Sequence, residues 1–264
     1  MKKNPLGIFD SGVGGLCVLK EIRKQLPKES IQYFADSNNC PYGSKAEDEA
    51  LLLAKKNIEF LIAQGCKLIV IACNTVTAVA IDNFRLEYNI PFVGMEPAIK
   101  PASFHTKSKK IGILATENTF KGKLFKQTYE KYANGIQVVV QPGYGLVELV
   151  EKGDLHSEKV RTLLKQYLEP MLEMGVDTLV LGCTHYPFLL HMIHEIAGDR
   201  LTIIDPAAAV AGQTRRILDG LGLMSDGDQE PEFQFYTTGE TTITQQFISK
   251  TMDMPYGLER VCIA

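Results

Sequence analysis

The sequence contains an internal repeat at an interval of about 110 residues. LIVIACNT at 68–75 resembles TLVLGCTH at 178–185, so that Cys73 and Cys183 stand 110 positions apart in matching contexts. A repeat of this length indicates two similar lobes, each one supersecondary unit that ends a core strand with a cysteine. Two further pairs of segments are similar at nearly the same interval. The segment 91–98 resembles 202–207, and 6–12 resembles 110–120 more loosely.

Short apolar runs alternate with amphipathic stretches along the chain. Near-continuous apolar runs are typical of parallel strands that are covered on both faces, and their alternation with helical patterns predicts βαβ units. We therefore expect an α/β fold of two pseudo-symmetric α/β domains with mainly parallel sheets and the active site in the cleft between them. The predicted strands are 6–9, 31–34, 68–72, 92–94, 110–114, 136–140, 178–181 and 201–204.

Four amphipathic stretches predict helices, and the first of them follows an S-x-x-E capping box formed by Ser44 and Glu47. The segment 222–234 is polar and rich in Gly and Asp, which favours a loop. We expect a first lobe at 1–97, a second lobe at 98–206, and a segment 207–264 that packs back on the first lobe. The predicted helices are 47–64, 118–132, 157–173 and 207–221.

Charge and composition exclude several classes of protein. The net charge of −3 leaves no excess of positive charge for nucleic acid, so no nucleic-acid partner is expected. The N-terminus does not resemble a secretory signal, and no apolar run is long enough to span a membrane. The six cysteines form no C-x-x-C pair and match no zinc spacing. We expect a cytoplasmic protein with no membrane partner and no metal.

Polar side chains stand directly after four of the predicted strands. In open α/β sheets, ligands bind beyond the carboxyl ends of the strands, so these clusters predict a site shared by both lobes. Backbone N–H groups at the 12–15 turn offer a place for a substrate carboxylate. The clusters are Asp10-Ser11-Gly12, Cys73-Asn74-Thr75, the segment 116–119, and Cys183-Thr184-His185.

A cysteine on each side of a cleft suits the inversion of a stereocentre. One thiolate removes the α-proton from one face, and a thiol returns a proton on the other face. The reference pKa of cysteine, about 8.5, lies close enough to neutrality for partners to tune it. Asp10 is a candidate partner for Cys73, and His185 is a candidate partner for Cys183.

Other interpretations remain open for individual residues. Asp10 could be an ordinary N-cap, Glu151 an exposed charge at a helix end, and the 10–15 turn a plain strand-to-helix connection or a phosphate cradle. If Cys73 and Cys183 are merely structural, the chain is a two-lobed small-molecule binding protein. The cysteines expected in the core are Cys17, Cys40, Cys66 and Cys262. His191 and His194 are expected on a helix surface.

Taken together, FDSGVGG, PYG (41–43), ACNT (72–75), GCTHYP (182–187) and DPA (205–207) resemble the bacterial glutamate racemases of the aspartate/glutamate racemase superfamily. The resemblance runs from position 6 to about position 207. It implies interconversion of L- and D-glutamate in a cleft between two lobes, without pyridoxal phosphate or metal. It also implies a supply of D-glutamate for peptidoglycan, and a homodimer.

The resemblance assigns roles to residues that match the family's motifs. Cys73 resembles the thiol that acts on D-glutamate, and Cys183 the one that acts on L-glutamate. Asp10 and His185 resemble assisting acid/base groups, as does Glu151 through a softer motif. Aspartate racemases share the two-cysteine logic, but His185 favours glutamate. Implied substrate contacts are Asp10, Ser11, Pro41, Tyr42, Gly43, Asn74, Thr75, Thr116, Thr119, Thr184 and His185.

Overall fold

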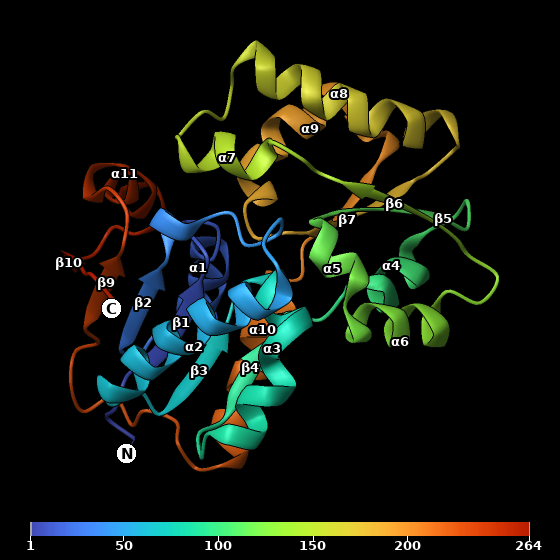
Figure 1. The fold of residues 1–264 in the computed structure, drawn as a ribbon. Coiled ribbons are helices and arrows are strands. Elements are labelled where there is room, and N and C mark those ends of the chain that lie inside the picture. The colour runs from blue at the N-terminus through green and yellow to red at the C-terminus, as the bar shows by residue number, and fades with distance from the viewer. Residues whose placement is uncertain (1, 264) are drawn as a thin grey trace.

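All eight predicted strands form, each within one or two residues of its predicted bounds. The computed structural model describes residues 2–263, which fold into two lobes, each built around its own sheet (Figure 1). Every strand pairing in the two sheets is parallel, as the apolar runs predict. The strands that were predicted are β1 (Leu6–Asp10), β2 (Ile31–Ala35), β3 (Leu68–Ile71), β4 (Phe92–Gly94), β5 (Lys110–Ala115), β6 (Gln137–Pro142), β7 (Thr178–Gly182) and β8 (Thr202–Ile204).

The first lobe contains two strands that the sequence did not reveal. Its strand order is β10-β9-β2-β1-β3-β4, with β9 (Phe233–Thr237) and β10 (Gly257–Arg260) coming from the end of the chain. The orange and red segments of Figure 1 accordingly lie beside the blue β2. The predicted loop at 222–234 is wrong at its end, because positions 233 and 234 already pair with β2. The short run FQFYT alternates in polarity next to a polar segment, which hid the strand.

The second lobe has the strand order β6-β5-β7-β8 and draws only on the middle of the chain. Helices at 146–151, 158–173 and 190–197 (α7, α8 and α9) cover one face of this sheet, and helices at 99–105, 117–121 and 123–132 (α4, α5 and α6) cover the other (Figure 1). The first sheet is covered in the same way, with helices at 47–63 and 74–87 (α2 and α3) on one face and helices at 16–25, 207–220 and 241–251 (α1, α10 and α11) on the other. Both sheets are therefore three-layer units with a buried core on each face.

The predicted helices form with two corrections. The stretch 118–132 is two helices that break at Gly122, and the helix at 47 has Ala46 as its N-cap with no side-chain cap bond, so Ser44 forms no capping box. The helices are α1 (Leu16–Gln25), α2 (Glu47–Ala63), α3 (Asn74–Glu87), α4 (Ile99–His105), α5 (Glu117–Lys121), α6 (Lys123–Tyr132), α7 (Leu146–Glu151), α8 (Glu158–Glu173), α9 (Leu190–Ala197), α10 (Ala207–Gly220) and α11 (Thr241–Thr251). No helix within residues 2–263 is long and apolar enough to cross a membrane.

Candidate active site between the lobes

The carboxyl ends of β3 and β7 bring the two repeated cysteines to one cavity. Cys73 follows β3 in the first lobe and Cys183 follows β7 in the second, and both line the same narrow space of about 10 Å³. Both side chains are almost fully buried. Parallel sheets present their ligand sites at this edge, which explains why the two motifs meet although 110 positions separate them.

Most of the predicted contact residues line this cavity. Asp10, Thr119 and Glu151 do not, and each instead holds a residue that does. Val147, from α7, lines the cavity without having been predicted, because it is one apolar residue in an apolar helix. The predicted residues on the cavity wall are Ser11, Pro41, Tyr42, Gly43, Cys73, Asn74, Thr75, Thr116, Cys183, Thr184 and His185.

The Cys73 thiol lies in a buried and electronegative environment. Its S–H donates to Ser11 Oγ at 3.5 Å. Burial raises the pKa of Cys73 to about 12, and the charge of Asp10 adds to the effect. Without substrate, Cys73 is therefore a protonated thiol at neutral pH.

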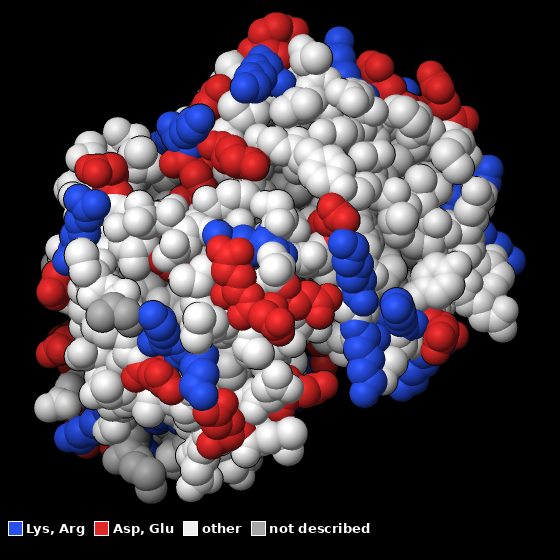
Figure 2. Space-filling model, viewed as in Figure 1, with Lys and Arg blue, Asp and Glu red and all other residues white. Residues whose placement is uncertain are grey.

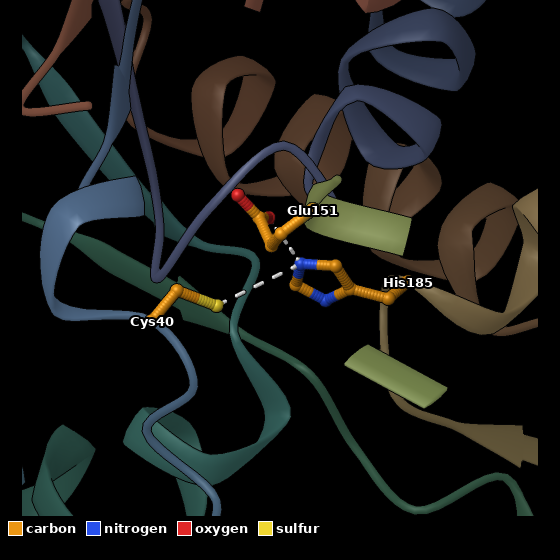
Figure 3. A group of neighbouring side chains, drawn as sticks. All are labelled: Cys40, Glu151 and His185. Carbon is orange, nitrogen blue, oxygen red and sulfur yellow. Dashed lines mark hydrogen bonds and ion pairs between the residues drawn. The ribbon is translucent and has the colours of Figure 1, made fainter. Parts of the chain in front are cut away.

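The Cys183 thiol begins a chain of polar groups that runs from the second lobe to the first. Cys183 Sγ lies 3.7 Å from His185 Nδ1, and His185 Nε2 lies 2.6 Å from Glu151 Oε1 (Figure 3). The same Glu151 oxygen accepts a bond of 2.7 Å from the Val13 N–H. The interpretation of Glu151 as an exposed helix-end charge is thus wrong.

His185 is held in a setting that favours its protonated form. Burial alone lowers the pKa of this imidazole, but its contacts with Cys183, Cys40 and Glu151 together raise that pKa well above its usual value. A buried imidazole with a carboxylate on one nitrogen and a thiol near the other can pass a proton between them. His185 therefore connects Cys183 to Glu151 both geometrically and electrostatically.

Asp10 is fully buried at the end of β1 and acts within the turn that follows it. Its Oδ2 accepts from the Gly12 N–H at 3.1 Å, and its Oδ1 accepts from Thr184 Oγ1 at 3.1 Å. It caps no helix, because α1 begins at Leu16 with Gly15 as its N-cap. Burial raises the pKa of Asp10, while the neighbouring His185 partly offsets that rise. Asp10 thus influences Cys73 through its charge and ties the first lobe to Thr184.

Glycines let the turn at 11–15 pass close to the second lobe. A Cβ on Gly14 would lie 2.5 Å from Thr184 Oγ1 and 2.6 Å from His185 Nδ1, and one on Gly12 would clash with the Glu151 carboxylate. No L side chain fits at such distances without movement of those groups. Gly12 and Gly14 are therefore needed for the close contact between the two lobes.

Polar side chains also join the lobes across the mouth of the cavity. Thr75 Oγ1 and Thr116 Oγ1 lie 2.9 Å apart, and Thr116 Oγ1 lies 2.9 Å from Thr119 Oγ1. Asn74 presents a buried Nδ2 that has no hydrogen-bond partner within the described residues. A buried amide donor without a partner costs stability, and its position on the cavity wall points to a ligand acceptor.

A buried network supports the PYG segment and was missed in the sequence. The Tyr42 hydroxyl donates to Asp36 Oδ2, and Asn57 Nδ2 donates to the same Asp36 oxygen at 3.1 Å. Asn118 Nδ2, from the second lobe, donates to the Lys45 carbonyl at 2.8 Å. Neither Asp36 nor Asn57 stands in a motif, although Tyr42 lies only 6 positions from Asp36. The network fixes the segment that forms one wall of the cavity.

The remaining cysteines and histidines divide into confirmed and wrong predictions. Cys66 is buried as expected, but Cys262 is exposed, and Cys17 and Cys40 are only partly buried. Cys40 is no ordinary core residue, since its Sγ lies 4.0 Å from His185 Nε2. His191 and His194 lie on the exposed side of α9, as predicted. Figure 2 shows that Lys and Arg side chains (blue) are interspersed with Asp and Glu side chains (red) over one face of the molecule.

Comparisons with known proteins agree on one family. The model of the Asp/Glu/Hydantoin racemase family matches residues 17–214. A glutamate racemase of Herpetosiphon aurantiacus is 45% identical over 91% of this chain and 94% of its own. The crystal structure of a glutamate racemase isoform from Bacillus anthracis superposes with a TM-score of 0.89 at 32% identity, covering 100% of this chain and 99% of that one. A glutamate racemase from Francisella tularensis, solved with D-glutamate, gives a TM-score of 0.84 at 29% identity, covering 100% and 99%.

Proposed function

Since the chain belongs to the Asp/Glu/Hydantoin racemase family, among its glutamate racemases, we propose that it inverts glutamate with Cys73 and Cys183 on opposite sides of the Cα. One thiolate takes the Cα proton, which leaves a carbanion on the substrate. The other thiol then gives its own proton to the opposite face. The starting thiolate ends as a thiol and the starting thiol as a thiolate, so the reverse reaction uses the same two groups with their roles exchanged.

The observation that carries this proposal is that thiols from the two different lobes line one cavity. Catalysis with a single base would need only one of them. Cys73 is the group proposed to act on D-glutamate, and Cys183 the group proposed to act on L-glutamate. The buried setting of Cys73 favours a neutral thiol at rest, so an assisting base has to receive a proton when Cys73 becomes a thiolate.

We assign that assistance to Asp10 on one side and to His185 with Glu151 on the other. The raised pKa of Asp10 makes it a better proton acceptor than an ordinary carboxylate. His185 stands 3.7 Å from Cys183 Sγ and 2.6 Å from Glu151, a spacing compatible with proton transfer in either direction. Asp10 lies in the electrostatic range of Cys73, while the thiol itself contacts Ser11.

The polar wall of the cavity is proposed to hold the substrate. Asn74, with its free Nδ2, and the hydroxyls of Ser11, Thr75 and Thr184 offer donors for the α-carboxylate or acceptors for the α-amine. The segment at 41–43 and Thr116 complete the wall, and Thr119 orients Thr116. The D-glutamate bound in the Francisella tularensis relative supports glutamate as the ligand class.

The wider setting follows from the resemblance and stays a proposal. The reaction is proposed to need neither pyridoxal phosphate nor metal and to supply D-glutamate for peptidoglycan in the cytoplasm. Six free cysteines suit a reducing compartment. The homodimer belongs to the same proposal, and so does the division of the chain into lobes at 97/98 and 206/207. Sedimentation velocity tests whether the protein is a homodimer.

The decisive experiment follows the Cα proton of each enantiomer in heavy water. With either enantiomer, the native protein should lose optical rotation and incorporate deuterium at Cα. Cys73→Ala should racemise nothing but still exchange the Cα proton of L-glutamate. Cys183→Ala should likewise exchange only D-glutamate. Each remaining thiol reaches one face alone, which is why exchange should be confined to one enantiomer.

Three outcomes would contradict the proposal. A single-cysteine variant with near-native racemisation would remove that thiol from its role. A requirement for added pyridoxal phosphate would exclude the two-thiol reaction. Faster turnover of aspartate than of glutamate in a substrate panel would reassign the substrate. Cys262→Ser, at an exposed position, is the matched control and should behave like the native protein.

A further inference from the structure

A second cavity lies on the side of His185 that faces away from Cys183. The ring directs Nδ1 toward Cys183 and the catalytic cavity, whereas Nε2 faces Glu151 and Cys40. Both of these residues line a separate cavity of about 310 Å³, between the loop before Cys40, α7 and the start of α11. The imidazole of His185 thus lies between the two cavities. The mechanism proposed above uses only one of them.

The side chains that meet at His185 Nε2 form a set of ligands for a soft divalent cation. Cys40 Sγ, Glu151 Oε1 and His185 Nε2 all lie within 4.8 Å of one another, and Figure 3 shows the three side chains converging. Thiolate, imidazole and carboxylate are the ligands that Zn²⁺ takes in proteins, at about 2.0–2.3 Å each. Three protein ligands leave a fourth tetrahedral position for a water from the cavity.

The cavity also has the charge that a cation needs. Glu148, Glu151 and Glu240 line it, against a single positive side chain, Lys152. Carboxylates that line a concave surface raise the local concentration of cations. The cavity is roomier than the catalytic one, so a hydrated ion can reach Cys40 and Glu151 without passing through the substrate cavity.

We propose that Cys40, Glu151 and His185 form a binding site for a thiophilic divalent cation, with Zn²⁺ as its best-matched ion, and that occupation of this site switches the enzyme off. The Cys40 S–H bond breaks as the sulfur–metal bond forms, and the proton leaves to solvent. The Nε2 proton of His185 also leaves to solvent, and the metal takes the freed Nε2 lone pair while Nδ1 keeps its proton. No electrons are transferred.

The inhibition rests on the proposed function of His185 and has a defined kinetic form. A metal-bound imidazole can no longer carry a proton between Cys183 and Glu151, so kcat should fall. The metal binds the Nε2 side of His185 and leaves its Nδ1 side at the substrate cavity, so KM for glutamate should stay nearly unchanged. Removing the metal with a chelator should restore the rate.

Binding and inhibition are measured separately with the full-length protein. Titration with Co²⁺ should give a thiolate-to-metal charge-transfer band at one equivalent, and competition with Zn²⁺ should remove that band. Cys40→Ser and Cys40→Ala should bind at least about 10–100-fold more weakly, because even an outer-shell partner of a metal site is worth that much. Cys262→Ser controls for adventitious binding at the exposed thiol and should bind like the native protein.

The outcomes distinguish this proposal from the proposed function. If the Cys40 variants keep the charge-transfer band and the Zn²⁺ inhibition, the site is elsewhere and the proposal is overturned. Inhibition that is competitive with glutamate would place the metal on the catalytic thiols and overturn it as well. If the native protein binds Zn²⁺ through Cys40 and still racemises at full rate, the binding site stands but the inhibition is overturned, and with it the role assigned to His185.

Discussion

At the scale of the residue, the thiol of Cys73 shows how a neighbour sets reactivity. Burial raises the pKa of Cys73 to about 12, with a further contribution from the Asp10 carboxylate. Cys66 has the same pKa, about 12, through burial alone and without a carboxylate. The two thiols therefore form an internal comparison. Burial is the largest cause of the raised pKa in both, and a carboxylate adds to it only at Cys73.

Asp10→Asn should lower the pKa of Cys73, because it removes a negative charge that disfavours the thiolate. At a fixed pH below that pKa, alkylation of Cys73 by iodoacetamide should then become faster, by about 2–10-fold for a shift of 0.3–1 unit. Mass spectrometry of the labelled peptides, without substrate, gives the rate. Cys66 should be unaffected, and an unchanged or slower rate at Cys73 would show that Asp10 does not act on this thiol.

The sequence was informative for residues in repeated or motif-bearing contexts and silent for those defined by distant partners. Cys73 and Cys183 could be found because the repeat marks them. Asp36 could not, because two of its partners, Asn57 and Thr238, lie 21 and 202 positions away in the chain. Cys40 was taken for a core residue, because nothing in the chain indicates that His185, 145 positions away, lies beside it.

At the scale of the element, the loop between β1 and α1 fixes the position of the first lobe relative to the second. Its glycines are where backbone and side chains of different lobes come closest. The eight strands could be predicted from apolar runs, since burial on both faces leaves few other options. The division at Gly122 and the strands β9 and β10 could not, because both depend on packing against elements far away in the chain.

Gly14→Ala should reduce kcat/KM by about 10–100-fold. The added methyl group displaces Thr184 and His185, and misplacement of catalytic groups by about 1 Å has effects of this size. Gly220→Ala, where a Cβ would meet no atom within 4 Å, is the matched control and should keep its activity. Equal activity of the two variants, measured by circular dichroism, would argue against a positioning role for the loop.

At the scale of the whole molecule, the cavity between the lobes is too small for the proposed substrate. Its volume of about 10 Å³ suffices for roughly one water molecule, and a complete glutamate needs several times that space. The lobes touch through hydrogen bonds such as those of Thr75 with Thr116 and of Asn118 with Lys45. Such bonds are each worth about 1 kcal/mol, so thermal motion can break them.

Entry of substrate should therefore require the lobes to separate. Small-angle X-ray scattering should show the radius of gyration of the ligand-free protein fall when saturating D-glutamate is added. Binding then shifts the population toward a more closed arrangement. The same sample without and with glutamate is its own control. Identical curves would contradict a hinge motion.

The pairing of β9 with β2 has a consequence for biosynthesis. Ile31 pairs with Phe233, so one central contact of the first lobe cannot form until the ribosome has added about 200 more residues. All strands of the second lobe's sheet are synthesised during that time. The edge of β2 that later pairs with β9 is meanwhile unpaired and can pair with another extended chain. Such late, long-range closure gives a high contact order and slow maturation. The nascent polypeptide therefore carries an unpaired strand edge until β9 emerges.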